Sequence, residues 1–111
     1  MNIEEYKQRA KLIRDNEIYK VYDLSELDNL TVSLTELYPQ KSTTGHSHDK
    51  ADEVYIFIDG EGTIEVANQT MKVKGKDIIL VPRGDFHKVH NKTEKNLNFW
   101  TIFEKYGGRG K

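Results

Sequence analysis

The most informative segment of the chain is GHSHDKADEVYIFIDG, residues 45–60. It carries two of the four histidines in the protein, His46 and His48, with one residue between them. Side chains along an extended chain alternate between two faces, so both imidazoles are expected on one face. Imidazole nitrogens that share a face can bind a common metal ion.

A carboxylate follows in the same segment, at the start of the apolar run of residues 53–58. Alternation places Glu53 on the same face as Tyr55 and Phe57, and three aliphatic side chains on the other face. Burying a lone carboxylate is costly unless it is paired or bound to a metal. We therefore interpret Glu53 as a further metal ligand.

A second histidine-bearing segment lies downstream, GKDIILVPRGDFHKVHN, residues 75–91. The Pro-Arg-Gly triplet at 82–84 predicts a tight turn, after which His87 opens a strand. His87 shares a face with Val89, whereas His90 is offset by three residues and points the other way.

The resulting candidate ligands are three histidines and one glutamate: His46, His48, Glu53 and His87. This set suits one divalent first-row transition metal, namely Mn, Fe, Co, Ni, Cu or Zn. Four protein ligands leave one or two positions open for water or substrate on a six-coordinate ion. Such a centre suits Lewis-acid or dioxygen chemistry.

The rest of the chain predicts an all-β domain. Asn2 followed by Glu5 resembles a capping box and predicts a short N-terminal helix from residue 3 to about residue 14. Short β-rich runs separated by turn residues favour a small antiparallel barrel or sandwich. The expected strands are residues 18–24, 31–38, 53–58, 63–66, 70–73, 78–81, 87–90 and 97–103.

Composition limits the classes of function. The 111 residues fit a single domain, with the barrel at about 30–103, a helix and strand at 3–24, and a mobile tail at 106–111. A net charge of −1 gives no overall field for nucleic acid or a membrane surface, and neither partner is expected. Cysteine is absent, which excludes disulfides and thiolate ligands. With no apolar leader and no run of the roughly 20 residues that span a bilayer, we expect a cytoplasmic protein.

These spaced residues resemble the two motifs of the cupins, a superfamily of small jelly-roll β-barrels. The first motif has His-x-His, three or four residues, Glu, six residues and Gly. The second has Pro-x-Gly, two residues, His, three residues and Asn. The matching positions are His46, His48, Glu53 and Gly60 for the first motif, and Pro82, Gly84, His87 and Asn91 for the second.

The chain departs from these motifs at two turn positions. Gln40 stands where the first motif begins with glycine, and six rather than five residues separate Gly75 from Pro82, which predicts a one-residue insertion at Lys76. The resemblance covers about residues 30–103. It implies that the four ligands hold the ion inside one end of the barrel, with Gly60 and Gly84 in turns.

Two enzymatic hypotheses follow from the resemblance. The pattern Thr44-Gly45-His46 is similar to that of cupin-type phosphoglucose isomerases, which implies a sugar-phosphate isomerase; a dioxygenase is the other hypothesis. Glu53 and Tyr55 are the candidate catalytic residues. The candidate substrate-binding residues are Thr44, Tyr55 and Arg83.

Two further hypotheses assign the protein a function without catalysis. One is a non-catalytic cupin that binds a small polar organic ligand. A strongly apolar pocket with no free acid or base beyond the ligands would favour it, or an oxygenase. The other is a purely structural module. We also expect a homodimer, in which residues 18–22 and 97–103 pair across a two-fold axis.

Overall fold

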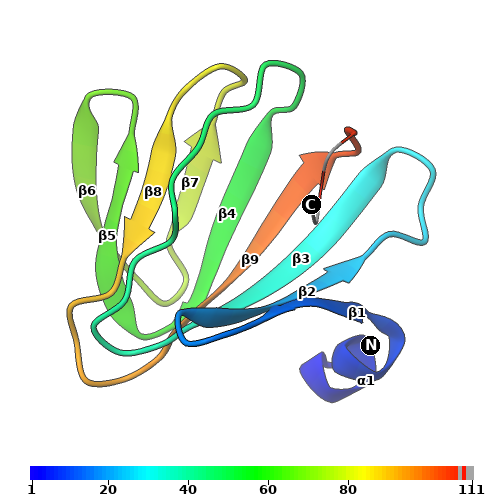
Figure 1. Ribbon diagram of the computed structural model, residues 1–111, viewed down its shortest axis with the longest axis horizontal. Helices are drawn as coiled ribbons and strands as arrows, with labels where there is room; N and C mark the ends of the chain where they lie inside the picture. Colours follow the sequence, from blue (N-terminus) through cyan, green and yellow to red (C-terminus); the bar gives the residue numbers. More distant parts are fainter. Residues whose placement is uncertain (108, 110–111) are drawn as a thin grey trace.

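The computed structural model describes residues 1–107 and 109, and consists of one helix and nine strands (Figure 1). The helix and strands are α1 (Ile3–Arg9), β1 (Lys11–Asp15), β2 (Tyr19–Leu24), β3 (Leu30–Leu37), β4 (Glu53–Asp59), β5 (Glu61–Val66), β6 (Gln69–Lys74), β7 (Ile78–Val81), β8 (His87–His90) and β9 (Leu97–Glu104).

The strands form two antiparallel sheets that face each other. One sheet has six strands in the order β1-β2-β3-β9-β4-β7, and the other has three in the order β6-β5-β8 (Figure 1). This confirms the all-β jelly-roll with a short N-terminal helix. Within the described residues the two sheets stay separate and do not close into one ring.

The core lies between the two sheets. Phe57 and Phe99 pack with ring centroids 5.2 Å apart, and Ile64 and Val89 are fully buried opposite them. The alternation predicted for residues 53–58 is confirmed, because Glu53, Tyr55 and Phe57 are buried while their neighbours are partly exposed.

The N-terminal region differs from the prediction. The Asn2 side chain caps α1 by accepting a hydrogen bond from the Glu5 amide, as expected, but the helix ends at Arg9 because Ala10 is extended. The residues beyond it form β1, which pairs with β2. The apolar residue Ile13, counted as part of the helix, belongs to this strand, since spacings of three and four residues are ambiguous in so short a segment.

The proposed strand pairing across a two-fold axis needs correction. Residues 19–24 and 97–104 form β2 and β9, and both strands are interior to the six-stranded sheet. Their backbone groups already pair with neighbouring strands on both sides, so neither offers a free edge.

The segment between β3 and β4 follows the edge of β8 (Figure 1). Isolated bridges join Ser42 to His90 and His46 to His87, and the amides of His46 and His87 donate to each other's carbonyls at 3.1 and 2.9 Å. This segment therefore acts as an irregular extra strand, which places His46 beside His87.

The two positions at which the chain departs from the cupin motifs both have a left-handed backbone conformation. Gln40 has φ 64° and Lys76 has φ 78°. Gly60, in the turn between β4 and β5, also has φ 90°, and a Cβ there would collide with the Asn96 carbonyl. Among the described residues no helix is long and apolar enough to cross a membrane.

Candidate metal centre

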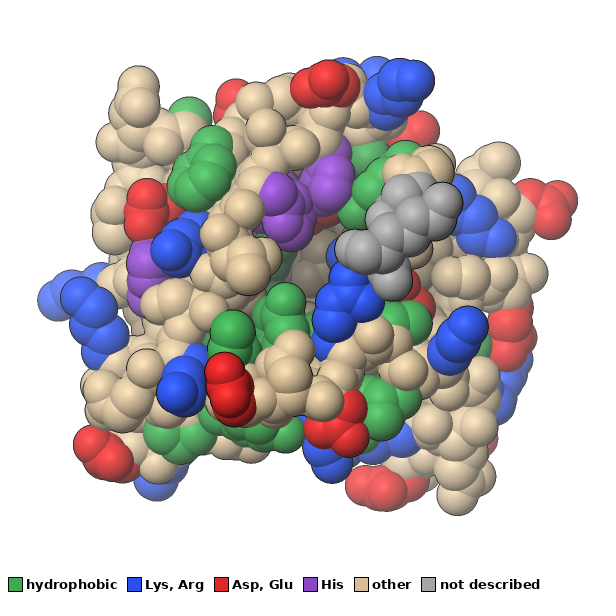
Figure 2. Space-filling view, viewed as in Figure 1, with side chains coloured by type: hydrophobic (Ala, Val, Ile, Leu, Met, Phe, Trp, Pro, Cys, Tyr) green, Lys and Arg blue, Asp and Glu red, His purple; other side chains and the backbone are tan. Residues whose placement is uncertain are grey.

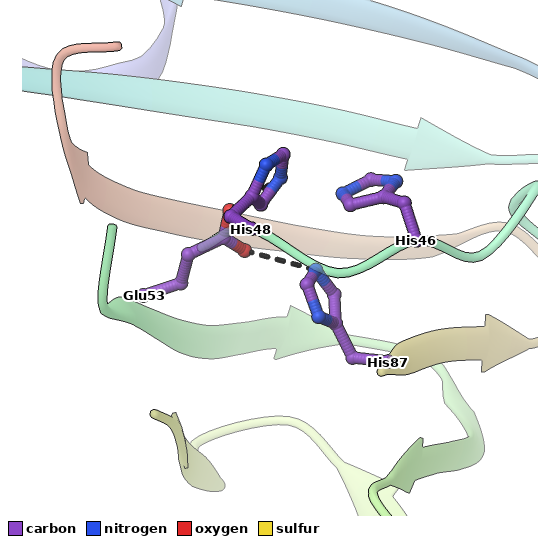
Figure 3. A group of neighbouring side chains, drawn as sticks. All are labelled: His46, His48, Glu53 and His87. Atoms are coloured by element: carbon purple, nitrogen blue, oxygen red, sulfur yellow. Dashed lines mark ion pairs between the residues drawn. The ribbon is translucent and has the colours of Figure 1, made fainter. Parts of the chain in front are cut away.

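The four predicted ligands converge at one end of the space between the sheets (Figure 3). Each of them offers one ligand atom, and these atoms all lie within 4.8 Å of one another. Glu53 is the first residue of β4 and His87 the first of β8, so the cluster joins the two sheets. His46 and His48 come from the segment that runs along β8.

Glu53 lies at the centre of the cluster. Its Oε1 is 3.2 Å from His48 Nε2 and its Oε2 is 3.3 Å from His87 Nε2. Glu53 is 4% exposed and His87 is 2% exposed. The carboxylate is therefore held away from water between two imidazole nitrogens, and such a buried charge requires a positive partner.

His87 is oriented for metal binding. Its Nδ1 lies 3.1 Å from the Asp85 carbonyl, which can only accept, so Nδ1 carries the proton. In the neutral ring Nε2 is then an unprotonated acceptor. This buried atom has no hydrogen-bond partner among the described residues, and it faces the Glu53 carboxylate. Two acceptors facing each other fit a cation, either a proton or a metal ion.

The electrostatics of the cluster favour the metal-binding protonation states of Glu53, His46 and His48, but not of His87. Burial raises the pKa of Glu53, but the facing histidines overcome this and hold it below its usual range. Partial burial, together with the neighbouring histidines, lowers the pKa of His46 to about 4, and burial also lowers that of His48. Burial lowers the pKa of His87 too, yet Glu53 and the Asp85 carbonyl raise it above its ordinary value.

A cavity of about 320 Å³ opens beside the cluster, and Figure 2 shows it as a hollow with histidine side chains at its rim. The polar residues that line it beyond the four ligands are Arg14, Tyr19, Thr35, Thr43, Thr44, Tyr55, Thr101, Tyr106 and Arg109. The arrangement can therefore hold a divalent cation next to a small, polar binding space.

Comparison with known proteins agrees with this geometry. The family model for the cupin domain matches residues 33–103. The chain is a cupin. It is 31% identical to germin-like protein 1-2 of Oryza sativa subsp. japonica over 80 residues, which are 68% of this chain and 36% of that protein. This cupin thus spans about a third of the length of that relative.

Solved structures share the fold. An oxalate decarboxylase from Lactobacillus farciminis, in complex with formate, superposes with a TM-score of 0.80 at 20% identity, over 89% of this cupin and 32% of that chain. A predicted oxalate decarboxylase from Thermotoga maritima gives a TM-score of 0.73 at 19% identity, over 79% of this cupin and 81% of that chain.

The other predicted site residues lie in different environments. Tyr55 is buried and lines the cavity, and burial beside Glu53 raises the pKa of its hydroxyl well above the ordinary value. Thr44 also lines the cavity. Arg83 does not; its side chain is 57% exposed and pairs with Asp52 and Glu104.

The prediction that His90 points away from the ligands is confirmed. Its Nδ1 lies 2.7 Å from Ser42 Oγ, and its Nε2 pairs with Glu65. Both partners lie outside the metal cluster.

Sequence reasoning missed several residues that line the cavity, among them Tyr106 and Arg109, which fall in the predicted mobile tail. The Tyr106 hydroxyl is 3.2 Å from His48 Nε2, and Arg109 forms an ion pair with the buried Asp23. Residues 108, 110 and 111 of that tail lie outside the described residues. The one available signal was Asp23, a carboxylate within a predicted strand, and it did not identify Arg109 as its partner.

Proposed function

We propose that this cupin is a metal-dependent enzyme that acts on a small polar organic molecule. The observation that carries the proposal is a His3Glu cluster opening onto a polar cavity of about 320 Å³. The likeness to structures described as oxalate decarboxylases supports it at the level of fold.

His46, His48, Glu53 and His87 would hold the ion. The unpartnered Nε2 of His87 and the buried carboxylate that faces it are the features that fit a cation. A bound Mn, Fe, Co, Ni, Cu or Zn ion supplies Lewis-acid chemistry and, where it is redox-active, dioxygen chemistry.

The residues of the chain then have distinct roles. Both oxygens of Glu53 face imidazole nitrogens and its pKa is low, so it suits metal binding better than general-base catalysis. The buried Tyr55 hydroxyl keeps its proton at neutral pH and lies beside Glu53 at the cavity, so we assign it as a hydrogen-bond donor to Glu53 or to a bound substrate. Thr44 lies at the same cavity and can orient a polar substrate.

Two reaction classes remain within the proposal, isomerisation of a small sugar phosphate and dioxygenation. Threonine and arginine side chains at the cavity favour a charged polar substrate over an apolar molecule in either reaction class. We also propose that the protein is cytoplasmic and that it forms a homodimer. Size-exclusion chromatography with light scattering tests the dimer.

A specific observation favours a second candidate, non-catalytic ligand binding. Among the described residues that line the cavity, no carboxylate or imidazole is present besides the four ligands. A site without a spare acid or base suits a protein that senses or stores a ligand.

The first experiment is elemental analysis of untagged protein purified without chelators, beside the His46→Ala/His48→Ala double variant. About one transition-metal ion per chain in the wild type and none in the variant supports the metal site. The loaded protein is then incubated with sugar phosphates and small organic acids, and product formation is followed by NMR. Metal-dependent turnover supports an enzyme, whereas binding without turnover supports the second candidate. An absence of metal after reconstitution contradicts the metal-dependent enzyme and leaves the second candidate or a purely structural module.

A further inference from the structure

Part of the cavity wall comes from segments outside the cupin-domain match, which covers residues 33–103. Tyr106 and Arg109 belong to this wall. Both residues lie beyond the part of the chain that the family model matches.

Arg109 is a well-anchored cation. Its Nε and Nη2 donate to the two carboxylate oxygens of Asp23, both at 3.0 Å, and Nη2 also donates to Ser33 Oγ at 3.1 Å. The guanidinium carbon lies 4.6 Å from the centre of the Phe103 ring. These contacts fix the orientation of the side chain.

Asp23 and Ser33 leave the two donors on Nη1, and the neighbouring Tyr106 side chain is a further hydrogen-bond partner of Arg109. Asp23 and Ser33 accept from three of the five N–H donors. Neither of these two residues uses the donors on Nη1, and Arg109 lines the cavity together with Tyr106.

Tyr106 places a second donor between Arg109 and the cluster. Its hydroxyl is 3.2 Å from His48 Nε2, and its ring lies over the His48 ring with centroids 4.4 Å apart. A hydroxyl at this position can donate to a ligand that sits beside the ligating nitrogen of His48.

We propose that Arg109 and Tyr106 form a carboxylate-binding subsite and that the substrate is a small organic acid. The proposal rests on the proposed function. Asp23 balances the single charge of Arg109, and a dication with the single Glu53 carboxylate would give the loaded site a net positive charge, so the cavity favours an anion. A planar carboxylate matches the guanidinium, as Asp23 already shows.

The test is calorimetric titration of zinc-loaded protein with malonate, and separately with inorganic phosphate. Loss of a charge-assisted hydrogen bond predicts that Arg109→Gln weakens malonate binding about ten-fold or more, and that Tyr106→Phe weakens it by a smaller factor. Arg9→Gln is the matched control, because Arg9 also pairs with a carboxylate, Glu26, but on the exposed surface.

Asp23→Asn separates recognition from a purely structural role. It removes the anchor of Arg109 but not its charge, so malonate should bind as tightly as in the wild type or more tightly. The double variant Asp23→Asn/Arg109→Gln removes the unpaired buried carboxylate that Arg109→Gln alone would leave, and should still bind weakly.

Several results would overturn the subsite. The subsite is excluded if Arg109→Gln binds malonate as tightly as the wild type, or if Asp23→Asn and Arg109→Gln lose the same amount of malonate affinity. It is also excluded if the wild type does not bind malonate at millimolar concentration, or if it binds phosphate more tightly than malonate. The metal content of every variant is measured as well, so that failure of the carboxylate subsite can be distinguished from failure of the proposed function. A loaded protein that binds malonate through Arg109 without any turnover keeps the subsite and contradicts the enzyme. If no metal binds, the same titrations on metal-free protein still test Arg109.

Discussion

Oε2 of Glu53 and Nε2 of His87 lie 3.3 Å apart, although the two residues open strands of different sheets. β4 belongs to the six-stranded sheet and β8 to the three-stranded one. A metal ion held by both residues therefore connects the two sheets directly. The site and the stability of the fold are coupled through this one pair.

The coupling predicts that metal removal destabilises the protein. A ligand that binds the native state alone stabilises it by RT ln(1 + [L]/Kd), about 2.7 kcal/mol when free metal exceeds Kd a hundred-fold. We expect EDTA to lower the melting temperature in a thermal-shift measurement. The His46→Ala/His48→Ala variant should melt at the same temperature with and without EDTA; an equal EDTA effect on that variant would place the metal elsewhere.

His87 and His90 form a natural pair of test and control. His87→Ala removes a buried ligand and should lower metal affinity by orders of magnitude, as measured by competition with a chromophoric chelator. His90→Ala should leave the affinity unchanged, because His90 contacts Ser42 and Glu65 instead of the ligands. Unchanged affinity in His87→Ala would exclude the assigned site.

Metal affinity should fall with decreasing pH, because protons compete for the imidazole nitrogens. The pKa of His87 is raised, so its proton is the first that a metal must displace. His46, with a pKa of about 4, is already neutral near pH 6, and burial shifts the pKa of His48 below that of a free imidazole. Below the pKa of His87 we expect affinity to fall about ten-fold per pH unit, the slope for one proton. A slope of three protons between about pH 5 and 6 would contradict the distinct environments of the histidines.

Asn91 should be a major stabilising residue away from the metal. Its buried side chain donates to the carbonyls of Leu37, Tyr38 and Lys95, and it accepts from Thr93. Asn91→Ala leaves these groups without a partner and should lower the free energy of unfolding by about 3 kcal/mol.

Urea denaturation measures this loss. Asn29→Ala is the matched control, because Asn29 lies on the surface and should change the stability by less than about 0.5 kcal/mol. A loss below about 1 kcal/mol in Asn91→Ala would show that water replaces its partners.

Strand positions were largely predictable from sequence because side-chain alternation is a local property of the backbone. The face shared by Glu53, Tyr55 and Phe57 follows from period two alone, and the structure confirms it. The opposite orientations of His87 and His90 follow from the same rule. The N-terminal strand β1 escaped prediction because its partner, β2, rather than its own sequence, fixes it as extended.

The sequence by itself determined the cupin family and the four residues that meet in the cluster, because a carboxylate in an apolar run needs a cation and the spaced histidines supply the remaining ligands for one. Only the tertiary structure decided the second wall of the cavity. Asp23 and Arg109 are far apart in the chain, and their ion pair depends on how β2 and the residues after β9 pack in space. Nothing local to either residue encodes that contact, so the environment that a substrate meets beside the metal cluster is a property of the fold.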